Sequence, residues 1–192
     1  LAISRGGDQT VIKDRLSFEF FGGRGFEVDK RTKVKSRVVA NTLAELMRDS
    51  SKVFVMGHRF ADLDSVGAAV GVCCIARKCG VKADIVIDIN KNASHALIDM
   101  MRSEPEYRDC FISPQDALLR SDGRTLLVIV DTNRPEQVEN AELLSVCSKV
   151  AVIDHHRVAA TYIQNAALGF TDPSASSACE LVVELREELV EQ

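Results

Sequence analysis

The sequence has 192 residues, of which 46% are apolar and 27% are charged, and its formal net charge is −4 at pH 7. This composition is typical of a globular protein and excludes a disordered chain. No apolar run approaches the roughly 18 residues of a transmembrane helix, so we expect no direct membrane contact. The mixed charge also argues against a protein that wraps long nucleic acids. One sizeable α/β domain with an appendage fits this length.

Residues 1–32 contain two Gly-Gly pairs and a short aromatic stretch, which predict two extended segments separated by turns. Because the chain begins with Leu1 and not with methionine, we expect it to be a piece of a longer protein. Residues 1–32 would then be the tail of a preceding module and a linker. From Lys33 to Asp49 the apolar residues recur at helical spacing and predict an amphipathic helix.

The rest of the chain alternates between short apolar runs and helical patterns. Strands are predicted at 52–58, 82–89, 110–112, 124–133, 149–156 and 161–164. Helices are predicted at 63–80, at 93–102, directly after Pro114, and from Ser174 to Glu188. The Leu-Leu-Val-Ile-Val run has no polar face, which is typical of a strand buried on both sides. The alternation predicts an α/β fold whose mainly parallel sheet has helices on both faces.

Acids and histidines follow three of the apolar runs, in "VFVMGHRFADLD", "LLVIVDTN" and "VAVIDHH". Because the carboxyl ends of parallel strands lie along one edge of a sheet, ligands bind there. We therefore expect seven polar side chains to share one neighbourhood: His58, Asp62, Asp64, Asp131, Asp154, His155 and His156.

Carboxylates crowded at the edge of a sheet repel one another unless they are protonated or bind cations. A pair of divalent metals is the simpler solution, and the mixture of carboxylate and imidazole suits manganese, iron or zinc better than calcium. Asp131, at the end of the middle strand, has two oxygens with which to bridge two ions. Two such ions activate a shared water and clamp a phosphoryl centre. The predicted reaction is hydrolysis of a phosphate ester or anhydride.

Structural roles explain each residue when it is taken singly. His58 suits a helix cap or a core position, Asp62 or Asp64 suits an N-cap, and Asp131 suits a turn. Taken together, these explanations require every polar strand end to be a coincidence. The six cysteines lie mostly in apolar stretches without CxxC pairs, which predicts reduced core thiols in a cytosolic setting.

The segments "GHRFADLDS", "VDTN" and "IDHHR" resemble the motifs of the DHH phosphoesterase superfamily, which includes RecJ-type exonucleases, nano-RNA phosphatases and family II pyrophosphatases. With "LAISRGGDQTVIK" and "FFGGRGFEVDKRTKVKSRVVA" upstream, the chain looks closest to the GdpP-type cyclic-di-AMP phosphodiesterases, in which a degenerate GGDEF domain precedes the DHH domain. The resemblance covers nearly the whole chain. It implies that residues 1–32 are the GGDEF tail and linker and that residues 33–192 are the DHH domain.

The resemblance also implies a site with two manganese ions. His58 and Asp62 would hold one ion, Asp64 and His155 would hold the other, and Asp131 would bridge them. The family supplies a further metal-binding Asp and a companion substrate-binding domain beyond the point where this chain ends. Without them, we expect the isolated segment to be weak or inactive.

Two more residues receive roles from the resemblance. His156 would face the substrate phosphate, and Asp154 would orient a neighbouring imidazole. The implied reaction hydrolyses cyclic-di-AMP to linear pApA, in a parent protein at the cytoplasmic face of the membrane and with a homodimer as one option. A nano-RNA phosphodiesterase, a pyrophosphatase and a non-catalytic nucleotide-binding regulator remain alternatives.

Overall fold

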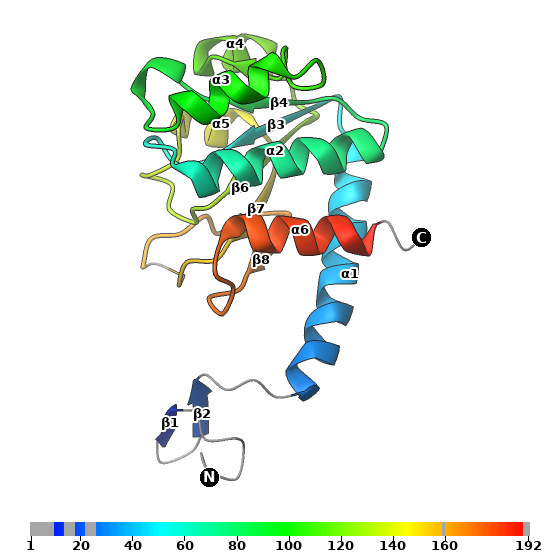
Figure 1. Cartoon of the computed structure of the whole chain (residues 1–192), viewed down its shortest axis with the longest axis vertical. Coiled ribbons are helices and arrows are strands. Elements are labelled where there is room, and N and C mark those ends of the chain that lie inside the picture. The colour runs from blue at the N-terminus through cyan, green and yellow to red at the C-terminus, as the bar shows by residue number, and fades with distance from the viewer. Residues whose placement is uncertain (1–9, 14–17, 22–25, 159, 190–192) are drawn as a thin grey trace.

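The computed structural model describes residues 10–13, 18–21, 26–158 and 160–189, with side chains from Lys35 onward. A parallel sheet lies between two layers of helices, and the long first helix runs from this body toward a small pair of strands (Figure 1). Within the described residues, no helix has both the length and the apolar character needed to cross a bilayer.

The strands form two sheets. An antiparallel pair consists of β1 (Thr10–Lys13) and β2 (Phe18–Phe21), where the sequence predicts two extended segments. The main sheet is parallel throughout, in the order β5-β4-β3-β6-β7-β8. Its strands are β3 (Lys52–Met56), β4 (Ala83–Val86), β5 (Phe111–Ile112), β6 (Thr125–Val130), β7 (Lys149–Asp154) and β8 (Leu168–Thr171).

Helices cover both faces of the main sheet, as the sequence predicts. One face packs against α1, α2, α3 and α6, and the other packs against α4 and α5. The helices are α1 (Phe26–Arg48), α2 (Leu63–Lys78), α3 (His95–Ser103), α4 (Pro114–Arg120), α5 (Ala141–Val146) and α6 (Ala178–Glu188), with a short 3-10 helix at Ile89–Lys91.

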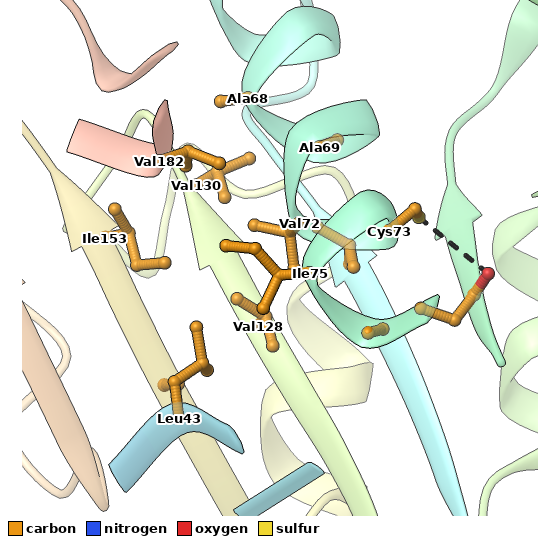
Figure 2. Close-up of a cluster of buried hydrophobic side chains, with 14 of the residues drawn as sticks. Leu43, Ala68, Ala69, Val72, Cys73, Ile75, Val128, Val130, Ile153 and Val182 are labelled. Carbon is orange, nitrogen blue, oxygen red and sulfur yellow. Dashed lines mark hydrogen bonds between the residues drawn. The ribbon is translucent and has the colours of Figure 1, made fainter. Parts of the chain in front are cut away.

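The core follows from the alternation of side chains along each strand. In β3, Val53 and Val55 point into the cluster under α2, whereas Phe54 and Met56 point into the cluster under α4 and α5. Every residue of β6 is buried, as expected for a central strand covered on both faces. Val72 of α2 and Val128 of β6 belong to the same buried cluster (Figure 2).

The structure corrects three of the predicted elements. The strand predicted at 161–164 is wrong: this segment is an exposed loop, and the sheet is instead extended by β8, which places Phe170 in the core. The first helix begins at Phe26 rather than Lys33, and the last begins at Ala178 rather than Ser174 because Ser177 caps it. The six-residue helix α5 has no predicted counterpart because it is too short for a helical repeat to be evident.

Candidate metal centre

The site lies where the order of the strands reverses. β3 and β6 are neighbours in the sheet, but the chain leaves β3 toward β4 on one side and leaves β6 toward β7 on the other. Open parallel sheets form a crevice at this point, beyond the carboxyl ends of the strands. The crevice is a pocket of about 650 Å³ lined by His58, Arg59, Phe60, Asp62, Asp64, Asp131, Gln137, His155, His156, Ser176 and Ser177.

Asp131 lies at the centre of the pocket and is only 3% exposed. Its Oδ2 is 3.4 Å from Nε2 of His58, and its Oδ1 is 3.4 Å from Nε2 of His155. Its backbone has φ of 60°, a left-handed conformation that costs a non-glycine residue about 1 kcal/mol or more. Oδ1 has no hydrogen-bond partner among the described residues. A buried carboxylate oxygen that lacks such a partner is a suitable ligand for a cation.

Two groups of possible ligands share Asp131. In the first, ligand atoms of His58, Asp62 and Asp131 all lie within 4.8 Å of one another; in the second, those of Asp131, His155 and His156 do. Asp62 is more exposed than Asp131 and lies 3.8 Å from Nε2 of His58. This arrangement fits two ions with Asp131 between them, and the mixture of oxygen and imidazole nitrogen fits a transition metal or zinc.

Asp64 is held from the far end of the chain. Its Oδ2 accepts the backbone N–H of Ala178, and its Oδ1 accepts that of Cys179, both at 2.8 Å. Burial works to raise the pKa of Asp64, but these two hydrogen bonds outweigh it and hold the pKa below its usual value. Oδ2 also lies 3.6 Å from Nε2 of His155, so Asp64 remains a charged neighbour of the second group.

The electrostatics of Asp131 and His58 are coupled. Burial, reinforced by the nearby charge of Asp64, raises the pKa of Asp131 above its usual value. The hydrogen bond with Asp131 raises the pKa of His58, although burial of the imidazole opposes this effect. The first shift therefore comes mainly from burial of the carboxylate, and the second comes mainly from the contact between the two side chains.

His156 is oriented from behind by Asp154. Nδ1 of His156 lies 2.8 Å from Oδ1 of Asp154. Asp154 is fully buried, and its Oδ2 accepts the side-chain N–H of Asn133. A carboxylate only accepts hydrogen bonds, so Nδ1 carries the proton. Asp154 does not line the pocket, whereas the imidazole of His156 lines it and is 57% exposed. The orienting role of Asp154 stays a prediction.

The DHH family N-terminal domain matches residues 52–192, which is most of the sequence and all of the pocket. The chain belongs to the DHH family.

Curated proteins of more than one kind are similar in sequence to this DHH domain. It is 41% identical over 190 residues to the cyclic-di-AMP phosphodiesterase GdpP of Bacillus subtilis (strain 168), covering 97% of this chain and 29% of that protein. It is 28% identical over 113 residues to a probable manganese-dependent inorganic pyrophosphatase of Streptococcus thermophilus, covering 57% of this chain and 33% of the other.

A solved structure shares the fold of the DHH domain. An exopolyphosphatase-related protein from Bacteroides fragilis superimposes with a TM-score of 0.60 at 18% identity, covering 78% of this chain and 43% of that one. This likeness concerns the fold, that is, the sheet and its helical layers. In length, the chain spans less than a third of GdpP.

The pocket of the DHH domain also contains residues that the sequence analysis did not identify as functional. They are Arg59, Phe60, Gln137, Ser176 and Ser177. Arg59 and Phe60 belong to the "GHRFADLDS" motif, and their position between two predicted ligands could have indicated that they line the site. No nearby motif in the sequence indicates a functional role for Gln137. Oδ1 of Asp172 accepts hydrogen bonds from Ser174, and Asp172 does not line the pocket.

Proposed function

We propose that the protein is a metal-dependent phosphodiesterase that hydrolyses cyclic-di-AMP to linear pApA through a two-manganese site. The observation that carries this proposal is the position of Asp131, buried between two groups of ligands with one carboxylate oxygen directed to each side. The identity of 41% with a cyclic-di-AMP phosphodiesterase over 97% of the chain supports the choice of substrate.

The proposed ligands are divided between two ions, and one ligand is shared. His58 and Asp62 would hold the first, Asp64 and His155 the second, and Asp131 both. Two bound divalent ions would lower the pKa of a shared water and neutralise charge on the phosphoryl oxygens. The relative named as a manganese-dependent pyrophosphatase supports manganese as the metal. The hydrogen bonds from Ala178 and Cys179 would keep Asp64 ionised and fixed in place before a metal arrives.

His156 would act on the phosphate. With its Nδ1 proton directed to Asp154, Nε2 is the ring nitrogen available to a ligand in the pocket. A proton on Nε2 would stabilise the charge on a phosphoryl oxygen or be donated to the leaving oxygen. Asp154 would hold the ring in place without touching the substrate, because it contacts Nδ1 of His156 and is fully buried.

The chain would be part of a longer protein. We assign residues 1–32 to the tail and linker of a GGDEF-like domain and residues 33–192 to the DHH domain, with anchoring of the parent at the cytoplasmic face of the membrane. The coverage of 29% of GdpP supports this assignment, since most of the relative has no counterpart in these residues. A further metal ligand and the companion substrate-binding domain would come from downstream, and a homodimer would be formed by the parent.

The test is turnover of cyclic-di-AMP, pApA and pyrophosphate by the full-length protein with manganese, compared with its Asp131→Asn variant. We expect cyclic-di-AMP to be cleaved to pApA and the variant to lose both activity and both ions, as measured by calorimetric titration with Mn²⁺. Preference for short RNA or pyrophosphate would change the substrate but keep the metal site. Two ions bound by the variant would remove the bridge from the proposal, and metal binding without any hydrolysis would favour a regulatory module.

A further inference from the structure

Phe60 is an exposed aromatic residue inside the metal-site motif. Its side chain is 66% exposed, although it stands between His58 and Asp62, two of the residues that line the pocket. Among the described residues that line the pocket, it has the only large apolar side chain. Its ring therefore contributes little to the core, and the packing of the fold does not account for it.

The turn that carries Phe60 is fixed. The backbone N–H of Arg59 donates to the carbonyl of Gln137 at 2.9 Å, and the N–H of Glu139 donates to the carbonyl of Gly57 at 2.9 Å. A β-bridge between His58 and Val138 lies between these two hydrogen bonds. These contacts hold the backbone before Phe60, and Oγ of Ser94 donates to the carbonyl of Ala61 directly after it at 3.0 Å. The backbone at Phe60 is therefore preformed and does not need to be ordered by a ligand.

Arg59 is placed against the aromatic ring. Its guanidinium carbon lies 5.4 Å from the centroid of the Phe60 ring, within the range of a cation–π contact. Aromatic rings and guanidinium planes are the surfaces on which unpaired nucleobases stack. The pair lies at a pocket of about 650 Å³, a volume typical of sites for small organic ligands and larger than a phosphate group requires.

We propose that Phe60, backed by Arg59, is a nucleobase platform on which one base of the substrate stacks while its phosphate lies at the metal centre. This proposal rests on the proposed function for the phosphate position and adds the group that recognises the base. Stacking uses the π face that every base has, so the platform selects nucleotides over pyrophosphate without selecting one base over another.

The experiment compares AMP with ribose 5-phosphate, which has the same sugar phosphate but no base. Binding of each to the manganese-loaded full-length protein is measured by calorimetry for the unsubstituted protein and for Phe60→Ala, Phe60→Leu and Phe60→Trp. We expect tighter binding of AMP by the unsubstituted protein and a loss of about tenfold to a hundredfold in AMP affinity for the Ala and Leu variants. Phe60→Trp should keep the preference, and ribose 5-phosphate should bind equally well to all four proteins.

Leu63→Ala is the matched control, because Leu63 is 67% exposed and stands between two acids but does not line the pocket. It should keep the preference for AMP. The platform is wrong if the unsubstituted protein binds both ligands equally or if Phe60→Ala keeps the preference for AMP. It is also wrong if Phe60→Ala weakens both ligands equally, since that result indicates a damaged metal site. Turnover of cyclic-di-AMP by the same preparations tests the proposed function separately, because AMP preference does not depend on which dinucleotide is cleaved.

Discussion

The carboxylate of Asp64, in the first turn of α2, accepts the backbone N–H of Cys179, in the first turn of α6, at 2.8 Å. A predicted metal ligand is thus fixed by a helix that begins more than a hundred residues later in the chain. The bond forms only because the two helices approach closely. Gly67 and Gly71 of α2 face Cys179 and Val182 of α6, and a Cβ on either glycine would lie within 3 Å of its neighbour.

Gly71→Ala should lower the free energy of unfolding. The added Cβ would lie 2.7 Å from Cγ1 of Val182, a β-branched side chain with little freedom to rotate in a helix. Overpacking costs about 1–3 kcal/mol, and the better helix propensity of alanine offsets about 1 kcal/mol of it, so we expect a net loss of up to about 2 kcal/mol. Urea unfolding measures this loss. Gly123→Ala is the control, since a Cβ there meets nothing within 4 Å, and an equal loss in both variants would contradict the explanation.

Asp131→Asn should make the metal-free protein more stable while it removes metal binding. The substitution removes a buried charge whose Oδ1 lacks a hydrogen-bond partner among the described residues, and asparagine tolerates the left-handed backbone at φ of 60°. We expect a gain of about 1 kcal/mol in chelator-treated protein. Added Mn²⁺ should then raise the melting temperature of the unsubstituted protein but not of the variant. A metal-free variant less stable than its parent would show that Asp131 serves the fold instead.

Asp154→Asn should reduce turnover without releasing metal. Asp154 contacts His156 but does not line the pocket, so its loss disturbs the orientation of one imidazole. Losses of this kind are about tenfold to a hundredfold. If Asp154 acts only through His156, the double variant with His156→Ala should be no slower than His156→Ala alone. Additive losses, or a large fall in Mn²⁺ affinity measured by calorimetry, would refute this positioning role.

Gly57→Ala should be strongly destabilising and should be partly rescued by Ser65→Ala. A Cβ at Gly57 would lie 1.8 Å from Oγ of Ser65, which is buried and has no hydrogen-bond partner among the described residues. Removing the hydroxyl leaves Cβ of Ser65 3.2 Å from the new methyl group, a tight but adjustable contact. We expect the single variant to lose about 3 kcal/mol or more and the double variant to recover at least 1 kcal/mol. Urea unfolding of all four proteins in this cycle measures the coupling.

Periodicity predicts the sheet well because buried parallel strands have a pattern of their own. The run from Leu126 to Val130 is apolar throughout, and it forms most of the central strand. The pattern fails at the edge: residues 161–164 and 168–171 are both short runs of mixed polarity, and only contact with β7 decides which of them joins the sheet. Local sequence cannot express that choice, because it depends on the burial of Phe170.

The residues of the site also fall into those that the sequence predicts and those that it does not. Residues that directly follow apolar strands, such as His58, Asp131 and His155, could be placed together from the sequence because strand ends converge at one edge of the sheet. The support of Asp64 by Cys179 could not be predicted, since backbone N–H groups of a distant helix carry no sequence signal. Phe60 was visible in the motif, but only its exposure and its fixed turn distinguish it from a core residue.

The pocket lies at the carboxyl-terminal edge of the sheet, where the strand order reverses. The chain can therefore vary in length at the opposite edge. Loops at the amino-terminal edge of the sheet, such as those at Gly80 and Gly123, join helices to strands without contributing to the pocket. Insertions there would leave the spacing of the acids and imidazoles unchanged. A single residue inserted directly after Asp64, in the first turn of α2, would rotate Asp64 by about 100° relative to the rest of the helix and turn its carboxylate away from α6. Divergence among DHH domains should therefore accumulate along one edge of the sheet and be scarce along the other.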